Sequence, residues 1–190
     1  MKKNIKNELT INDSGWMAGV KHVLSPNYND RPSDTKINLI VLHCISLPPL
    51  NFGGNYIEKF FLNKLNPDEH PYFETISRTK VSSHFLIRRD GECVQFVSCE
   101  KRAWHAGNSI WHGLRDCNNF SIGIELEGHH ECAFTNEQYM ILTSLVRALK
   151  KRYPITHQKA HSDIGLPIGR KHDPGKFFNW EKYKKLLKSK

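Results

Sequence analysis

The sequence lacks any long hydrophobic stretch. A membrane-spanning helix needs about 20 consecutive apolar residues, and no such run occurs among the 190 residues. The basic N-terminus is followed by polar residues from Asn7 to Asp13, which do not form the apolar core of a signal peptide. We therefore expect a protein without a membrane segment that works in the cytoplasm.

Acidic residues are scarce relative to basic ones. The chain has 19 Asp and Glu against 28 Lys and Arg, which gives a formal net charge of +9. A charge of this sign favours an anionic partner, which could be nucleic acid, anionic lipid or a small molecule with carboxylates. Part of the charge comes from lysines near the two ends of the chain, where a solvated tail is the simpler interpretation.

Paired cysteines are also lacking. The five cysteines form an odd count without a C-x-x-C motif, which argues against a disulfide framework and favours a reducing compartment. No Cys/His spacing matches a zinc finger, and no basic recognition helix is evident. We therefore do not expect a protein that binds nucleic acid.

Internal repeats and Gly/Ser-rich linkers are absent from the sequence. A chain of this length can fill one core well but not two. We expect a single domain over residues 1–190, with loose tails at 1–15 and 188–190, and a monomeric protein.

The sequence does contain alternating signals for strands and helices. An apolar run predicts a strand at residues 38–43, alternation predicts another at 121–126, and Asp90-Gly91 predicts a hairpin between strands at 83–89 and 93–97. Helices are expected at 56–62, at 135–152 behind a capping box of Thr135 and Gln138, and near the C-terminus. This mixture predicts an α/β fold, a single domain with a central mixed β-sheet flanked by helices.

The first candidate chemistry comes from the histidines, of which there are eleven. His43 ends a predicted strand, His161 follows the long predicted helix, and Asp173 lies in a turn made rigid by Pro174. Two imidazoles and a carboxylate suit catalytic zinc, which takes three protein ligands and leaves a fourth position for water. Spacing alone leaves surface or hydrogen-bonded roles for these histidines open.

Several short motifs occur together along most of the chain, from about Trp16 to Leu187. They are Leu42-His43, Ser46-Leu-Pro-Pro49, Phe52-Gly-Gly54, His70-Pro-Tyr-Phe73, Val81-Ser-Ser-His84, Leu86-Ile-Arg-Arg-Asp-Gly91, Arg102-Ala-Trp-His-Ala-Gly107, Phe120-Ser-Ile-Gly-Ile-Glu-Leu-Glu-Gly128 and Arg170-Lys-His-Asp-Pro-Gly175. In this order they resemble the N-acetylmuramoyl-L-alanine amidase family, related to phage T7 lysozyme and peptidoglycan recognition proteins. The match is best with its cytoplasmic members that act on anhydro-muropeptides.

The resemblance implies a zinc-dependent amidase that cuts the bond between N-acetylmuramic acid and L-alanine during cell-wall recycling. His43, His161 and Asp173 match the family's zinc ligands, although cobalt or nickel would suit the same donors. The glutamate that handles the proton of the attacking water matches Glu125, with Glu127 as the second choice. Lys171 matches the lysine that stabilises the oxyanion, and Tyr72 matches a tyrosine near the active site.

The implied muropeptide substrate carries several carboxylates, which arginine binds in a bidentate manner. We expect contacts to this peptide from basic residues and a contact to the sugar from a tryptophan, the candidates being Arg170, Lys80, Arg88, Arg115 and Trp104. Trp111 is a second sugar-site candidate, and either tryptophan could instead belong to the core.

Two residues depart from the pattern of the family. Cys44 follows His43 where asparagine is expected, and Asp116 stands where a basic residue is expected. These departures affect the expected peptide contacts and leave the zinc ligands intact. Two other functions remain as alternatives: an amidase that acts on intact peptidoglycan, and a metal-free module that only binds muropeptides.

Overall fold

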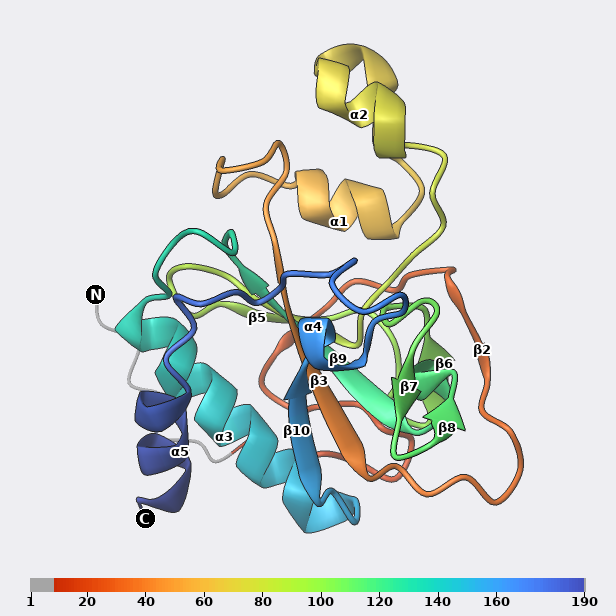
Figure 1. Ribbon diagram of the computed structural model, residues 1–190, viewed down its shortest axis with the longest axis vertical. Coiled ribbons are helices and arrows are strands. Elements are labelled where there is room, and N and C mark those ends of the chain that lie inside the picture. The colour runs from red at the N-terminus through yellow and green to blue at the C-terminus, as the bar shows by residue number, and fades with distance from the viewer. Residues whose placement is uncertain (1–8, 190) are drawn as a thin grey trace.

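In a computed structural model, which describes residues 9–189, a sheet of six strands forms the centre of the molecule (Figure 1). In spatial order its strands are β1 (Lys21–His22), β5 (Cys93–Gln95), β4 (Phe85–Ile87), β9 (Ser121–Glu127), β3 (Leu39–Ile45) and β10 (His157–Ala160). All neighbouring pairs are parallel except the hairpin of β4 and β5, so the sheet is mixed as predicted.

The two longest strands occupy the middle of the sheet. β3 and β9 pair along their full lengths, from Leu39 opposite Ser121 to Ile45 opposite Glu127. Every residue of β9 is buried, as are the first five residues of β3. Burial on both faces explains the continuous apolar run Leu39–Leu42 at the start of β3.

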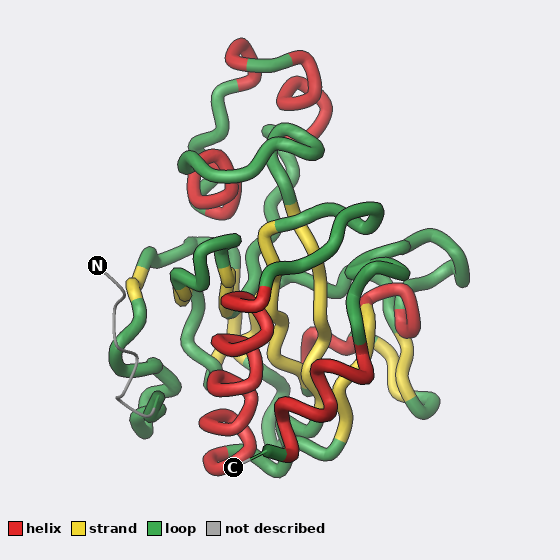
Figure 2. Tube along the Cα trace, turned by 90° about the vertical axis from the view of Figure 1, so that its left-hand side faces the viewer, coloured by secondary structure: helices red, strands yellow, loops and turns green. Residues whose placement is uncertain are grey.

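Helices α3 (Asn136–Arg152) and α5 (Trp180–Lys188) lie side by side over one face of the sheet (Figure 2). Thr135 and Gln138 form the predicted capping box at the start of α3. Leu142, Val146 and Leu149 of α3 and Tyr183 of α5 join the sheet in the largest apolar cluster. The helical periodicity of the sequence is therefore confirmed.

The remaining short elements lie around the sheet. Helices α1 (Tyr56–Phe61) and α2 (Pro71–Ile76) lie beyond one end of it (Figure 1), and Ile57, Phe60 and Phe61 of α1 are buried as predicted. The other elements are the helix α4 (His161–Ile164), the 3-10 turns η1 (Pro67–Glu69) and η2 (Cys117–Asn119), and the strands β2 (Tyr28–Asp30), β6 (Lys101–Ala103), β7 (Ile110–Trp111) and β8 (Leu114–Arg115).

The predicted tails need correction where the structure describes them. The carbonyl oxygens of Ser14 and Gly15 accept hydrogen bonds from Ser98 Oγ and Gln95 Nε2, so residues near position 15 are fixed to the loop after β5. Lys188 ends α5, and Ser189 caps that helix. The prediction of loose tails is thus wrong for these residues, while residues 1–8 and 190 lie outside the described part.

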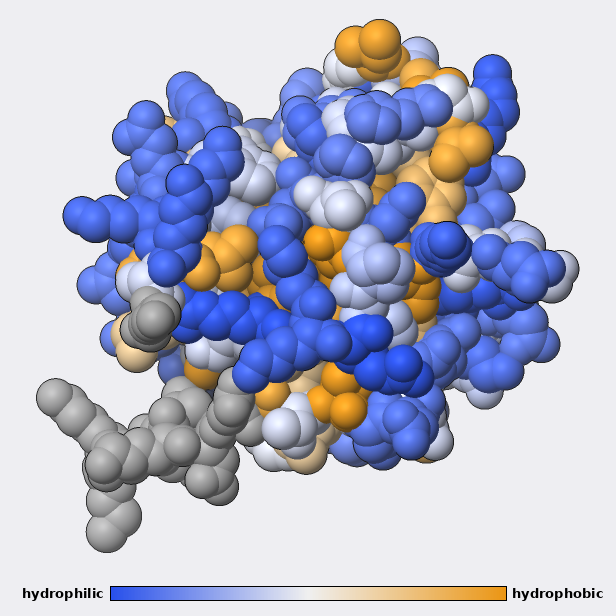
Figure 3. Space-filling view, turned by 90° about the horizontal axis from the view of Figure 1, so that it is seen from below, coloured by the Kyte–Doolittle hydropathy of each residue, from blue (hydrophilic) through white to orange (hydrophobic). Residues whose placement is uncertain are grey.

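None of the helices in the described part of the chain could span a membrane. No helix within residues 9–189 has the length and hydrophobicity that crossing a bilayer requires. The face seen from below is mainly hydrophilic, with apolar residues scattered singly or in small groups (Figure 3). Scattered apolar residues are ordinary for a protein surface.

Candidate active site

The carboxyl ends of three adjacent parallel strands bring the predicted catalytic residues together. His43 of β3 lies directly opposite Glu125 of β9, and cross-strand partners share one face of a sheet. On the other side of β3, β10 ends at Ala160, and His161 follows as the first residue of α4. Asp173 joins them from a later loop, which is tied to α4 by a hydrogen bond from Ser162 N to its carbonyl oxygen.

The three predicted ligands form a tight triangle of donor atoms. His43 Nδ1 lies 3.0 Å from His161 Nδ1 and 3.0 Å from Asp173 Oδ2, and the third side measures 3.1 Å. Tetrahedral zinc with bonds of about 2.0–2.1 Å separates its donors by about 3.3 Å, so a small opening of the triangle fits the metal. These residues also form one of two groups of potential metal ligands among the described residues.

Hydrogen bonding at His161 independently points to a cation in the triangle. His161 Nε2 lies 3.0 Å from the carbonyl oxygen of Ala106, which can only accept, so Nε2 carries the proton. In neutral His161 the Nδ1 lone pair then faces the Asp173 carboxylate at 3.1 Å. Two acceptors at this distance need a positive charge between them, and a divalent metal ion satisfies both.

Burial keeps the imidazole of His43 neutral. The pKa of His43 is lowered from 6.5 to about 4, mainly because the ring is buried and secondly because His161 lies beside it. At Asp173 burial alone would raise the pKa, but the close contacts with His161 and His43 hold the pKa of this carboxyl well below its usual range. A neutral imidazole and an ionised carboxylate are the protonation states that bind metal.

Glu125 supplies an ionisable carboxyl beside the triangle. It is buried, and its Oε2 atom has no hydrogen-bond partner among the described residues. Burial raises the pKa of Glu125 well above 4.5, the charge of Asp173 raises it further, and Lys171 partly opposes both. A carboxyl with a raised pKa can take and return a proton near neutral pH.

Glu127, the second choice for this role, has a structural function instead. Its carboxylate accepts hydrogen bonds from the backbone of Gly53 at 2.6 Å and of Arg89 at 3.0 Å, and it pairs with Arg88 at 3.3 Å. These bonds occupy both oxygens and tie the loop after β3 to the β4–β5 hairpin. The hydrogen bonding thus distinguishes Glu125, which has an unpartnered oxygen, from Glu127, whose two oxygens are both bonded.

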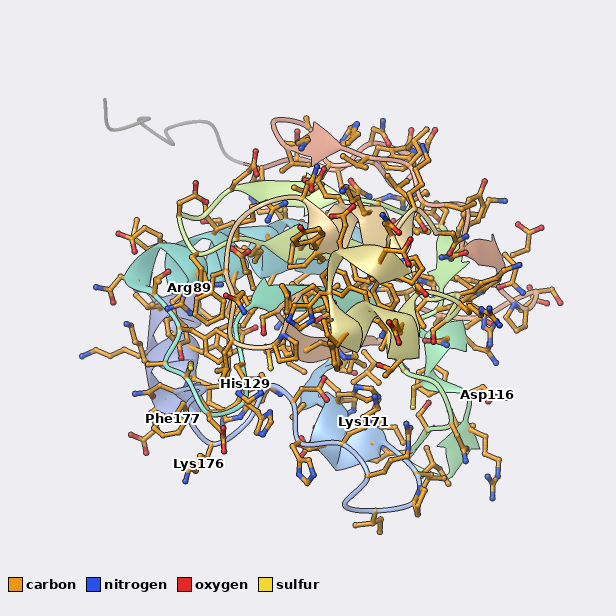
Figure 4. The ribbon with its side chains drawn as sticks, turned by 90° about the horizontal axis from the view of Figure 1, so that it is seen from above. Arg89, Asp116, His129, Lys171, Lys176 and Phe177 are labelled. Atoms are coloured by element: carbon orange, nitrogen blue, oxygen red, sulfur yellow. The ribbon has the colours of Figure 1, made fainter. Side chains whose placement is uncertain are left out.

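A cavity of about 580 Å³ opens over the site. Glu125 and Asp173 are the acidic residues among its described lining residues, whereas Arg170 and Lys171 bring positive charge. Lys171 lies on the loop that carries Asp173 (Figure 4). Tyr72 of α2 and Trp104 after β6 line the same cavity, and their contacts with a substrate stay predictions.

Three predicted substrate contacts do not line this cavity. Arg88 is held in ion pairs with Glu58, Glu92 and Glu127, so its predicted peptide contact is wrong. Arg115 is exposed on β8, in the β7–β8 hairpin. Lys80 is exposed between the lining residues Thr79 and Val81, and its contact stays a prediction.

The two departures from the family pattern lie in different places. Cys44 lines the cavity directly after His43, and burial raises the pKa of its thiol above the usual range. Asp116 adopts a left-handed conformation with φ of 58° before η2 and lies to one side, away from Lys171 (Figure 4). Trp111 packs against Lys159 and His112, and it is absent from the described lining of the cavity.

Three histidines of this cavity carried no site prediction. His129 and His130 are half-buried and line it, as does His172. His105 is buried with its Nδ1 atom 3.0 Å from His43 Nε2. The signal for His105 lay in the motif Arg102–Gly107, but only the fold shows which atom it contacts.

Comparison with known proteins agrees with this geometry. Residues 33–176 match the family model described as N-acetylmuramoyl-L-alanine amidase. The 1,6-anhydro-N-acetylmuramyl-L-alanine amidase AmpD of Citrobacter freundii is 46% identical over 175 residues, which cover 92% of this chain and 94% of that protein. AmpD of Escherichia coli is 45% identical, with 92% and 96% covered. A crystal structure of an AmpD selenomethionine derivative superposes with a TM-score of 0.90 at 47% identity, covering 94% of this chain and 99% of that one.

Proposed function

The chain belongs to the N-acetylmuramoyl-L-alanine amidase family, and from this premise we propose that it uses zinc to hydrolyse 1,6-anhydro-N-acetylmuramyl peptides at the amide bond to L-alanine. The activity as a muropeptide amidase of cell-wall recycling follows from relatives that match nearly the whole chain. The zinc ion and the residue roles are proposals that the geometry supports.

One observation carries the proposal: a buried triangle of His43, His161 and Asp173 stands beside Glu125, a buried carboxyl with an oxygen free for a partner. These three ligands would hold the zinc ion. When bound, zinc acts as a Lewis acid toward the scissile carbonyl and lowers the pKa of water to about 7.

Glu125 is proposed as the proton carrier of the reaction. An amide nitrogen is a poor leaving group unless it is protonated, so a group must take a proton from the attacking water and deliver it to the amine. The carboxyl of Glu125 faces the cavity, and its pKa is raised by burial. It can hold this proton without competition from a fixed hydrogen bond to Oε2.

Lys171 and Tyr72, which both line the cavity, are proposed to act on the substrate. The ammonium group of Lys171 would stabilise negative charge on the carbonyl oxygen as the tetrahedral intermediate forms. Its influence reaches the centre of the site, since its charge lowers the pKa of Glu125 and of His43. Tyr72 is 38% exposed at the cavity wall and would contact the substrate.

Substrate binding is assigned to the basic part of the cavity. Arg170 donates hydrogen bonds to the carbonyl oxygens of Leu166 and Asn108, which hold its guanidinium at the cavity edge. From there it would pair with a carboxylate of the stem peptide, Lys80 would offer a second positive charge, and Trp104 would contact the sugar. The protein would act as a monomer in the cytoplasm, in keeping with its five free cysteines.

The test is mass spectrometry of the products formed from anhydro-N-acetylmuramyl tripeptide, with zinc-loaded protein, chelator-treated protein and intact peptidoglycan as a second substrate. We expect free tripeptide and the anhydro sugar, loss of both products on chelation and slow release from the polymer. Bound but uncut substrate in the zinc-loaded sample would contradict the proposal and favour a binding module. Faster cleavage of the polymer would favour a wall-lytic amidase.

A further inference from the structure

His105 lies directly behind one of the proposed metal ligands. Its ring is buried and meets His43 edge-on, with ring centroids 5.1 Å apart and an interplanar angle of 81°. The two nitrogens in contact, His105 Nδ1 and His43 Nε2, are 3.0 Å apart. One of them must donate and the other accept, so the protonation of each ring determines that of the other.

The proposed zinc site decides the direction of this hydrogen bond. His43 turns Nδ1 toward His161 and Asp173, so Nδ1 must keep its lone pair if His43 is a ligand. Its proton then resides on Nε2 and is donated to His105 Nδ1. His105 in turn carries its own proton on Nε2, which lies 3.3 Å from Ser121 Oγ.

We propose that His105 is a positioning residue that fixes His43 in the Nε2–H tautomer and thereby prepares its Nδ1 lone pair for the metal. The inference rests on the proposed zinc-dependent function. It adds a residue that would act on the metal site through His43 rather than as a ligand. Partners of this kind orient a ligand imidazole and raise its basicity.

The neighbouring residue performs the same task for the second ligand. The carbonyl oxygen of Ala106 accepts the Nε2–H of His161 at 3.0 Å. The backbone N–H groups of His105 and Ala106 both donate to Asn118 Oδ1, at 3.1 and 2.8 Å. One dipeptide, held by one buried asparagine, therefore fixes the tautomers of both imidazole ligands.

The central strand leaves room for this ring at a single glycine. A Cβ atom at Gly123 would lie 2.5 Å from His105 Cγ, closer than real side chains approach. Gly123 stands in β9 two residues before Glu125, on the same face of the sheet. β9, which contains the proposed proton carrier Glu125, thus also provides the surface against which the His105 ring packs.

The experiment compares zinc affinities of the metal-free wild type and two variants by competition with a chelating dye. His105→Leu removes the acceptor, and we expect a dissociation constant about 10–100-fold higher. His105→Asn keeps an acceptor oxygen near the place of Nδ1 and should restore most of the affinity. Long-range ¹H–¹⁵N spectra of the zinc-loaded wild type should show His43 and His105 both protonated at Nε2.

The matched control is His84→Asn. His84 is also buried and its ring contacts that of His105, but its ring nitrogens lie against Arg31, the Lys101 carbonyl oxygen and Gly123 N, and among the described residues they make no hydrogen bond to His43. Its zinc affinity should equal that of the wild type. If His105→Leu does not fold, His105→Asn and the spectra still decide the question.

Wild-type affinity in His105→Leu would overturn the inference and leave the proposed function standing, whereas a proton on His43 Nδ1 in the zinc-loaded protein would exclude His43 as a ligand and overturn both. A wild type that binds no zinc would overturn both. Loss of turnover with intact zinc affinity and the expected tautomers would count against the proposed function alone.

Discussion

The imidazoles of two groups of potential metal ligands line one cavity, and the groups differ in how these rings are held. The inner group consists of His43, His161 and Asp173. Its two imidazoles lie at strand ends, and their Nε2 atoms are hydrogen-bonded to His105 and to the Ala106 carbonyl oxygen. The rim group, His129, His130 and Glu131, occupies a turn after β9 and is half-buried to exposed. Ligand atoms lie within 4.8 Å of one another in both groups.

Proximity alone therefore does not distinguish the two groups, whereas hydrogen bonding does. At the rim, His129 Nδ1 accepts a long bond of 3.3 Å from the backbone of Glu131 in the same turn. A metal ion there would have to replace this bond and order an exposed carboxylate. In the inner group the lone pairs already converge, so binding costs little reorganisation.

Removal of an inner ligand should have the largest effect. In His161→Ala, zinc content measured by mass spectrometry of the metal should fall from one ion per chain to background, and hydrolysis should disappear with it. The reason is that two remaining donors cannot complete a catalytic zinc site. If the variant kept its zinc and its activity, the inner group could not be the metal site, and the rim group would have to bind the ion instead.

The next largest effect is expected at Glu125. Glu125→Gln keeps the size of the side chain but cannot carry a proton, so kcat should fall about 10²–10⁴-fold while zinc content stays the same. Glu127→Gln is the matched control. It should keep the zinc and most of kcat but unfold more easily, because Arg88 loses a buried partner. Steady-state rates and thermal unfolding of both variants separate the two carboxylates.

The contrast between these glutamates shows how far the sequence could lead. The alternation of β9 puts both carboxylates on one face, and the family motif favours Glu125, but nothing local reveals that Gly53, Arg88 and Arg89 occupy Glu127. These partners come from segments distant in the chain. Strand and helix positions were predictable because they depend on local periodicity and caps, as at Thr135.

Charged side chains were harder to assign than metal ligands. Arg88 was expected to bind substrate because it is basic and lies in a family motif, yet three carboxylates from α1, the hairpin and β9 surround it. Conversely, His129 and His130 line the cavity, and Gly175 in the loop after Asp173 packs so closely on His130 that an added Cβ atom would lie 2.3 Å from its carbonyl oxygen. Such contacts arise only when distant loops meet.

The buried histidines behind the inner group should also shape the pH dependence of stability. Burial, with the charge of Arg31 as a second cause, lowers the pKa of His84 from 6.5 to about 3. Between these values the unfolded chain binds a proton that the folded protein does not. The free energy of unfolding should therefore decrease as the pH falls through this window, by up to about 1.4 kcal/mol per pH unit.

His84→Asn should flatten this slope in urea unfolding of the metal-free protein measured between about pH 4.5 and 6.5. Asparagine can still accept the bond that Gly123 N now donates to His84 Nδ1. A slope equal to that of the wild type would mean that His84 does not contribute to it.

The smallest effect is expected at the rim. The double change His129→Ala with His130→Ala removes both rim imidazoles, yet tight zinc binding should stay within about twofold of the wild type, since neither ring is bonded to the inner ligands. Chelator competition gives the affinity, and the metal content should remain one ion per chain. A loss of tight zinc binding as large as that in His161→Ala would contradict this expectation. It would mean that the half-exposed rim group binds zinc as firmly as the buried inner group, so that converging lone pairs do not determine where the metal binds.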